Sequence, residues 1–590
     1  MQLYLIDEFF RLDGVTGELL EKEFSGEFAP HGDGISLDCC RNEYVSFQVV
    51  FEAESSEAGD ALIAFEPLES GQGSIPAGCY SAYAEWFHSI GENAIPDALV
   101  PMAAQGTEFR MPVFPDCAAK PRIRVLWVDL FVPKGTQAGI YRGGMTTFAG
   151  GISRRFTIEL QVHNVTLTDD SLIYADMNNY ADSLSPAFPA LASNPRRYDD
   201  GAYAQVEQAF HRMSYDHRCI FHNLGYDHAG YVIPGYAPEL TGEGKQMRVS
   251  DWERFDRHFG PLLSGAAFEG LNRPAQPIPY MYLPFNFDWP SSYDKWGKKG
   301  YRTEYRRVLA DFLSHFERNG WTDTRLELFL NHKKRYRMFP YDGDETRFEG
   351  DEALFDIYND LNGSLPGSSP VKFLFRMDSS WSYGRHFHSR FADIVKMWVV
   401  NGTIFLWYPQ SVALMKQKGN VLWNYGGLND MSDSHLLLTV WPFRCIMTGI
   451  TGVTFWNATG FGADWLRTPL ENGRQAAFYP GFAFGCDGPV PSIRLKALRN
   501  AMQTADLMMM LDGTEWMPPM KQIINRHFGT SDGGWWSPRP AFADEPPHTW
   551  TNAKLSEAPR ANIKGALSPA IAGRIKLEAM ELMERLGINV

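Results

Sequence analysis

Two patterns of hydrophobic and polar residues divide the chain near residue 168. Before it, apolar and polar side chains alternate with a period of two, as at 44–51, 125–132 and 156–162, and clusters of Gly, Pro, Asp and Ser separate these runs. Such alternation is typical of antiparallel strands that bury one face. It predicts an N-terminal antiparallel β-sandwich over residues 1–168.

After residue 168, short apolar runs alternate with helical patterns. The apolar runs begin near 172, 219, 278, 326, 373, 397, 421 and 452, and helical periodicity covers 303–319, 351–361 and 435–448. Eight such strands with intervening helices predict a (β/α)8 TIM-type barrel over residues 169–515, the expected catalytic domain. A helix at 491–511 with Ser492 as its N-cap follows. Residues 516–590 are predicted to form a C-terminal extension that packs on the barrel and ends in a helix at 568–587.

Polar and aromatic residues follow most of the predicted barrel strands, where this fold places its active site. Carboxylates and amides hold sugar hydroxyls, and Trp and Tyr rings stack on sugar faces, so the mixture suits a carbohydrate substrate. Because polar residues end strands in most proteins, each position also has a purely structural explanation. The candidate substrate-binding residues are Asp176, Asn178, His222, Asn286, Asp288, Trp289, Asn331, His332, Lys333, Asp378, Trp381, Trp407, Tyr408, Tyr425 and Trp456.

The densest group of acidic residues lies at 341–352 and contains the adjacent pair Asp344 and Glu345. Glycosidases need two carboxyl groups at the scissile bond. In substrate-assisted enzymes one carboxylate orients the sugar's acetamido group and its neighbour is the acid, so adjacent Asp and Glu residues suit that chemistry. The alternative is a solvated acidic loop, which composition alone favours.

Composition and charge exclude several classes of function. The 590 residues carry a net charge of −15, which repels nucleic acids and anionic membranes, and the 14% aromatic content fits either sugar-binding clefts or a large core. No metal-binding, nucleotide-binding or serine-hydrolase motif occurs, so we expect no metal and no cofactor. The N-terminus is acidic rather than basic, no apolar run is long enough to span a membrane, and the seven cysteines lack CxxC spacing. We therefore expect a cytoplasmic protein, unless a leader has been removed.

Several segments together resemble the family 123 glycoside hydrolases and their relatives. They are RNEYVSFQ at 41–48, VDLFVP at 128–133, GIY at 139–141, YPG at 479–481 and GPVPSIRLK at 488–496. The resemblance spans almost the whole chain and implies a sandwich followed by a catalytic barrel. It also implies a retaining β-N-acetylgalactosaminidase mechanism through an adjacent Asp-Glu pair at the end of a barrel strand.

Here the matching strand, 326–330, is followed by Asn331, His332 and Lys333 instead, which is the pattern of a divergent branch. Asp344 and Glu345 are then the best match to the catalytic pair, with Glu345 as general acid/base, and Asp351 with Glu352 is the weaker match. The expected function is glycoside hydrolysis of a carbohydrate, such as a glycan that contains an N-acetylhexosamine. The alternatives are a carbohydrate-binding protein without catalysis and an assembly scaffold that forms a homo-oligomer through its sandwich.

Overall fold

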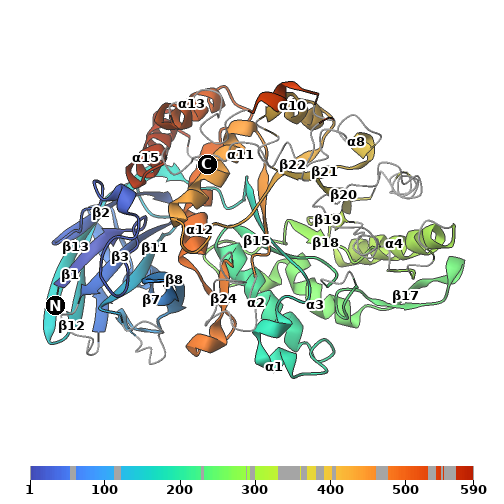
Figure 1. The fold of residues 1–590 in the computed structure, drawn as a ribbon, viewed down its shortest axis with the longest axis horizontal. Helices are drawn as coiled ribbons and strands as arrows, with labels where there is room; N and C mark the ends of the chain where they lie inside the picture. The colour runs from blue at the N-terminus through green and yellow to red at the C-terminus, as the bar shows by residue number, and fades with distance from the viewer. Residues whose placement is uncertain are drawn as a thin grey trace.

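The computed structural model describes most of the chain and shows a β-sandwich beside a parallel barrel. Figure 1 shows the blue strands of the sandwich on the left and the barrel on the right, with helix α12 (Ile493–Met509) between them. The described residues are 2–52, 61–111, 121–227, 231–286, 289–292, 295, 299–329, 359, 369–379, 391–401, 405, 407–459, 476–528, 540–546, 549 and 567–588.

The N-terminal part consists of two facing sheets around one apolar core, as the alternating pattern predicts. The core includes Phe47, Val49, Val128 and Leu160. All strand pairs in the two sheets are antiparallel except β2 with β13. One sheet has the order β1 (Gln2–Asp7), β3 (Glu43–Glu52), β11 (Ile123–Val132), β7 (Tyr80–Ile90) and β8 (Asn93–Pro101). The other contains β2 (Gly34–Arg41), β13 (Ile152–Thr166), β12 (Gly139–Ala149), β4 (Ala61–Phe65), β10 (Glu108–Arg110) and β9 (Ala104–Gln105), with β5 (Leu68–Ser70) and β6 (Gly73–Ile75) attached through β12.

Strand β3 is buried on both faces, although its alternating sequence predicts one polar, exposed face. Ser46 and Gln48 are as buried as Phe47 and Val49. Helix α12 covers the second face: the side-chain amide of Gln503 exchanges hydrogen bonds with both backbone groups of Tyr44, each at 2.9 Å. Ser46 therefore serves the interface with the helix, because Arg499 and Asn500 donate to its hydroxyl, whereas Gln48 donates to the backbone carbonyls of Asp7 and Phe10.

A buried carboxylate, Asp129 on β11, ties α12 to this sheet. It accepts hydrogen bonds from Arg499 Nη1 and Nη2, both at 2.8 Å, and from Lys496 Nζ at 2.7 Å. The Ser46 hydroxyl and the Trp127 indole N–H also donate to it, both at 2.8 Å. Burial alone would raise the pKa of Asp129, but the two cations outweigh burial and hold the pKa well below its ordinary value.

The second part contains eight parallel strands that form a nearly closed barrel, in agreement with the predicted TIM-type architecture. Hydrogen bonding is interrupted between β15 and β18, which are the two ends of the sheet path. In sequence the strands are β14 (Tyr174–Asn179), β15 (Cys219–Asn223), β18 (Tyr280–Tyr282), β19 (Arg325–Leu328), β20 (Lys372–Ser379), β21 (Met397–Asn401), β22 (Val421–Gly426) and β23 (Gly452–Trp456).

Helices occupy connections between these strands. They are α2 (Ala202–Asp216), α3 (Glu253–Ser264), α4 (Lys299–Asn319), α8 (Phe391–Ile394), α10 (Pro409–Gln417) and α11 (Val440–Thr448). The predicted helix at 303–319 lies within α4, whereas the one predicted at 435–448 is a 3-10 helix, His435–Thr439, followed by α11. Of the helix predicted at 351–361, only residue 359 is described.

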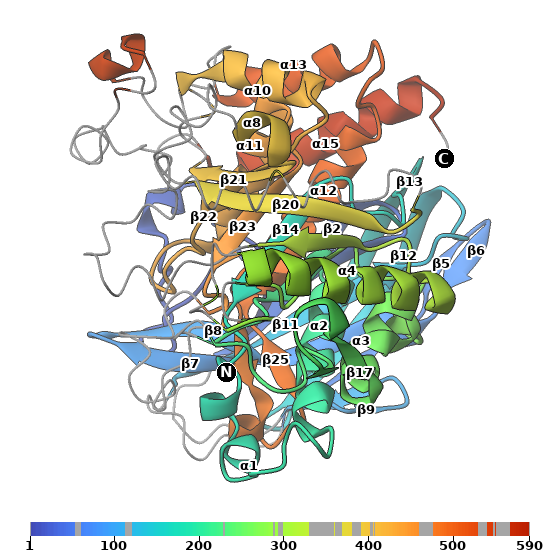
Figure 2. The same ribbon diagram turned by 90° about the vertical axis from the view of Figure 1, so that its right-hand side faces the viewer.

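The C-terminal helices agree with the sequence prediction. Ser492 caps α12, because its hydroxyl accepts a hydrogen bond from the Leu495 amide at 3.0 Å. Helix α13 (Met517–Phe528) follows, and α15 (Pro569–Arg585) corresponds to the final helix. Figure 2 shows α10, α11, α13 and α15 gathered on one side of the barrel strands β21 to β23.

Shorter elements complete the described structure. The short strands are β16 (Glu239–Thr241), β17 (Arg248–Asp251), β24 (Phe478–Pro480) and β25 (Pro489–Pro491), and the short helices are α1 (Pro189–Ala192), Lys22–Phe24, Ala77–Cys79, Ser185–Ala187, Gly244–Gln246, Ala266–Phe268, Gly481–Phe484 and Ala541–Asp544. Within the described ranges, no helix combines the length and the apolar character needed to cross a bilayer.

Candidate functional site

The barrel interior is layered along its axis. Near the N-terminal ends of the strands it is filled by apolar and aromatic side chains such as Ile220, Met397 and Trp423. At the C-terminal ends, the mouth is lined by a second cluster of mostly aromatic side chains: Tyr180, Leu224, Tyr226, Tyr282 and Phe329, with Trp456 packed against them. Between these two apolar layers lies a layer of charged residues.

Five ionisable side chains from four strands form this charged layer: Asp176 (β14), His222 (β15), Glu327 (β19), and Arg376 and Asp378 (β20). Arg376, which is 1% exposed, lies at the centre. Its Nη1 donates to Glu327 Oε2 at 3.0 Å and to Asp176 Oδ2 at 3.4 Å. Its Nε and Nη2 donate to the two oxygens of Asp378, at 2.8 and 3.4 Å. One guanidinium therefore joins three carboxyl groups.

Asp176 is the most completely hydrogen-bonded of these acids. Besides Arg376, Thr454 Oγ1 donates to its Oδ2 at 2.9 Å, and His222 Nδ1 lies 3.0 Å from its Oδ1. Burial would raise the pKa of Asp176, but His222 and Arg376 together lower it below its ordinary value. We infer that Asp176 is ionised and fixes the orientation of the imidazole.

Glu327 has far fewer partners. It is completely buried, and besides its bond from Arg376, its Oε2 lies 3.7 Å from His222 Nε2. Its Oε1 has no hydrogen-bond partner in the described part of the chain. Burial raises the pKa of Glu327, and the opposing effect of Arg376 and His222 is too small to reverse the shift.

Asp378 is the acid that lies nearest to the mouth, two residues beyond Arg376 on the same strand. Its side chain is 16% exposed, whereas those of Asp176 and Glu327 are fully buried. Burial raises its pKa and Arg376 opposes that shift. A carboxylate with a bidentate guanidinium partner and an exposed edge is suited to accept hydrogen bonds from ligand hydroxyls.

Side chains bridge the interruption between β15 and β18. The imidazole of His222 stacks on the ring of Tyr282, with ring centres 4.0 Å apart and planes inclined by 24°. The hydroxyl of Tyr282 accepts a hydrogen bond from Asn178 Nδ2 at 2.9 Å, which links β18 to β14. The open edge of the barrel is therefore fixed by the same residues that line the site.

The structure brings together only some of the residues predicted from the sequence. Asp176, Asn178, His222 and Asp378 meet in or beside the charged layer, and Trp456 lies at the mouth. Because β14, β15 and β20 extend further than predicted, the first four lie inside strands rather than after them. Tyr425 is also in the interior, packed against the lower apolar layer.

Four predicted residues lie elsewhere. Trp407 is 4% exposed and packs edge-on against Phe542, with ring centres 5.6 Å apart. Trp289 packs against Phe285 and against Phe312 of α4, and it forms a tight backbone turn with the buried Asn286. Tyr408 precedes α10 as its N-cap residue. The prediction that these residues line the cleft therefore lacks structural support.

The remaining predicted residues fall outside the described residues. They are the substrate-binding candidates Asp288, Asn331, His332, Lys333 and Trp381 and the catalytic candidates Asp344 and Glu345.

Sequence reasoning missed Glu327, Arg376, Thr454 and Tyr282. It placed site residues after strands, whereas these four lie within them. The signal was nevertheless present: Glu327 and Arg376 are charged residues inside short apolar strands, and such a charge is rarely buried without a partner. In the ranges that the structure describes, no group of three or more His, Cys, Asp or Glu side chains is arranged to hold a metal ion.

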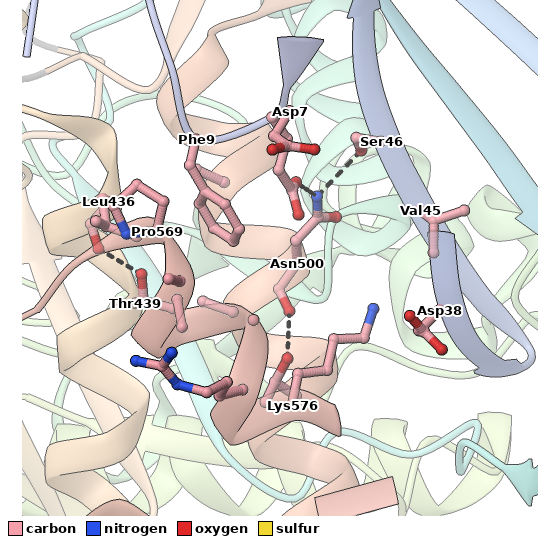
Figure 3. A pocket seen from close by; sticks show the side chains of 18 of the residues that line it. Asp7, Phe9, Asp38, Val45, Ser46, Leu436, Thr439, Asn500, Pro569 and Lys576 are labelled. Atoms are coloured by element: carbon pink, nitrogen blue, oxygen red, sulfur yellow. Dashed lines mark hydrogen bonds between the residues drawn. The ribbon is translucent and has the colours of Figure 1, made fainter. Parts of the chain in front are cut away.

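A separate cavity of about 420 Å³ lies where the sandwich meets α12 and α15. Asp7, Asp38, Ser46, Asn500 and Lys576 are among its lining residues (Figure 3). The polar groups there bind one another: Asn500 Nδ2 donates to Ser46 Oγ at 3.0 Å and also to the Glu8 carboxylate. None of the sequence-predicted site residues lines this cavity, so it is distinct from the barrel site.

Comparisons with known proteins indicate the fold. No protein-family model and no curated protein match the chain. The chain is similar in structure to a family 123 glycoside hydrolase from Clostridium perfringens that was studied for glycolipid glycan hydrolysis. The two sequences are 11% identical, the match covers 99% of this chain and 98% of that chain, and the TM-score is 0.63. This similarity shows a shared fold over the full length.

Two other structures are much less similar. One is a putative alpha-galactosidase from Bacteroides fragilis, with 8% identity, coverage of 80% and 78%, and a TM-score of 0.25. The other is an endo-beta-1,4-mannanase from Thermotoga petrophila, with 12% identity, coverage of 57% and 77%, and a TM-score of 0.31. Neither score is high enough to support an argument.

Proposed function

We propose that this protein is a glycoside hydrolase that binds a carbohydrate at the aromatic mouth of the barrel. The observation that carries the proposal is the layer of three carboxyl groups, Asp176, Glu327 and Asp378, directly beneath the rings of the mouth. Barrel enzymes bind their substrates at this end of the strands, carboxyl groups serve proton transfer and hydroxyl binding, and aromatic rings stack on sugars. The fold shared with a glycoside hydrolase supports the proposal.

The proposed substrate is a glycan that contains an N-acetylhexosamine, and the proposed catalytic pair is Asp344 and Glu345. The acetamido group of the sugar attacks the anomeric carbon, Asp344 orients that group, and Glu345 protonates the leaving oxygen. Strand β19 ends at Leu328, next to the mouth residue Phe329, and the two acids follow Phe329 in the sequence by 15 and 16 residues. Asp351 with Glu352 is the alternative pair.

The experiment that tests this function compares Glu345→Gln with the wild type on two substrate classes. With a poor leaving group, the variant should lose at least about 100-fold in turnover, because the amide cannot donate the required proton. Aryl glycosides with activated leaving groups should retain more of their rate. Asp342→Asn, in the same segment, is the matched control and should retain activity. Glu352→Gln tests the alternative pair and should also retain activity if Asp344 and Glu345 are the catalytic residues.

Two results would count against this function. Unchanged hydrolysis by Glu345→Gln would remove Glu345 from the mechanism and direct attention to Asp378, the partly exposed acid of the barrel. Inactivity of the wild type on a broad panel of aryl glycosides and natural glycans would argue against hydrolysis altogether.

The second candidate function is carbohydrate binding without catalysis. The observation that favours it is that Arg376 already binds all three described carboxyl groups of the layer. Calorimetry distinguishes the two functions: a pure binding protein would bind sugar equally well after Asp344→Asn and Glu345→Gln and would show no turnover.

A further inference from the structure

The three carboxyl groups around Arg376 are not equally stabilised. Asp378 receives two guanidinium hydrogen bonds and is partly exposed to solvent. Asp176 is bonded to Thr454, to His222 and to Arg376. Glu327 receives one bond, from an Nη1 that it shares with Asp176, and its Oε1 has no partner within the described residues. Glu327 is thus the carboxyl group for which a negative charge is most costly.

The charges of the layer do not balance if all three acids are ionised. Three carboxylates, two of them fully buried, would then face one guanidinium, and even a protonated His222 would leave one net negative charge. An unpaired buried charge is expensive, and like charges in one site raise the proton affinity of the group that is least well solvated. The geometry therefore places a proton on Glu327.

We propose that Glu327 is a positioning residue of the barrel site that stays protonated at neutral pH and thereby leaves the charge of Arg376 to hold Asp378 ionised at the mouth. The importance of this for catalysis rests on the proposed function, since an ionised Asp378 would bind sugar hydroxyls and stabilise positive charge that develops at the reacting carbon. The titratable and charged groups that face Glu327 are Asp176, His222, Tyr280, Tyr282 and Arg376. Asp378 lies on the other side of the Arg376 guanidinium, which binds both acids.

Infrared spectroscopy tests the protonation state without requiring turnover. A protonated carboxylic acid has a C=O stretching band that an ionised carboxylate lacks, and solvent-exposed carboxyl groups are ionised at pH 7. The difference between the wild type and Glu327→Gln at pH 7 should contain one such band. Isotope labelling of Glu carboxyl carbons should shift the band, whereas labelling of Asp should not. Because burial also raises the pKa of Glu85 to about 8 and that of Glu8 to about 7, the labelling is done in a Glu8→Gln, Glu85→Gln background, so the test remains valid if Glu327→Gln fails to fold.

Matched variants control the assignment. Glu85→Gln is the positive control, because burial raises the pKa of Glu85 to about 8, and its own band should disappear. Glu304→Gln is the negative control, and no band should be lost. Burial opposes ionisation of Glu304, but hydrogen bonds from Ser291, the Gly244 backbone and Lys295 lower its pKa below the ordinary value.

Two results would overturn the proposal: a spectrum unchanged by Glu327→Gln, or a band that shifts with Asp labelling only. The proposed function fails separately, through absence of turnover. A wild type that shows the Glu327 band but hydrolyses no glycoside would retain the proton assignment and lose the enzyme assignment.

Discussion

Replacing Asp129 should be the most destabilising single substitution between the sandwich and the barrel. Asp129→Asn keeps the shape of the side chain but removes its charge, and it leaves Lys496 and Arg499 buried without their carboxylate. These two side chains are 1% and 0% exposed, so water cannot replace the lost partner. The new amide N–H₂ also faces hydrogen-bond donors where an acceptor is required.

The size of the effect follows from this burial. Removing one partner of a buried ion pair costs about 3–5 kcal/mol, because an uncompensated charge remains in the interior. Here two cations lose one shared anion, which favours the upper part of that range. Since a whole domain is stabilised by roughly 5–15 kcal/mol, the variant should lose a large share of its stability.

Urea unfolding monitored by tryptophan fluorescence and by circular dichroism measures this loss. Trp127, which donates to Asp129, is one of the 17 tryptophans that contribute to the fluorescence signal. The matched control is the triple variant Asp129→Leu, Lys496→Met, Arg499→Met, which removes all three charges. It should recover much of the lost stability, because apolar groups of similar volume often replace a buried ionic cluster at little cost.

Two outcomes would refute this reasoning. A loss below about 1 kcal/mol for Asp129→Asn would show that the cations reach solvent or another acceptor. A triple variant no more stable than Asp129→Asn would show that the loss comes from shape or from the Ser46 and Trp127 hydrogen bonds rather than from unpaired charge.

Three further predictions concern pH, ligand binding and helix capping. Burial raises the pKa of Glu85 from 4.5 to about 8, so the folded state binds this proton more tightly than the unfolded state. The stability that this proton contributes is complete below pH 4.5 and falls as the pH rises to about 8. In thermal unfolding, Glu85→Gln should flatten that decline. Trp456→Ala should weaken sugar binding by about 1–3 kcal/mol in calorimetry, and an unchanged Kd would exclude stacking on this ring. Ser492→Ala should cost about 1 kcal/mol in urea unfolding, because α12 loses its N-cap, and Ser492→Thr should retain most of that stability.

The architecture was largely predictable from local sequence pattern. Period-two alternation located β3, β11 and β13, and short apolar runs located the eight barrel strands. These patterns are informative because they report which side chains each strand buries, a property that neighbouring residues largely decide. Strand ends were less predictable: β14 and β20 continue through polar residues that the prediction placed after them.

The candidate site was only partly predictable. The rule that barrel sites lie at strand C-termini identified Asp176, His222 and Asp378, which the structure brings together. It could not identify Glu327 and Arg376, because the role of a charged residue inside an apolar strand can be recognised only when its partners on other strands are known. Those partners are up to 200 residues apart in the sequence, as Arg376 and Asp176 are.

The sequence by itself determined that the chain forms a β-sandwich and a parallel barrel, since each strand carries its own pattern of apolar positions. Only the tertiary structure decided what covers those strands. Ser46 and Gln48 lie at the polar positions of an alternating strand, yet both are buried. Ser46 lies against Arg499 and Asn500 of α12, and Gln48 donates to the backbone carbonyls of Asp7 and Phe10. Trp407 was predicted to face the cleft, and it packs on Phe542. Burial depends on which distant segment packs against a surface, and this packing is determined by the free energy of the whole fold rather than by neighbouring residues.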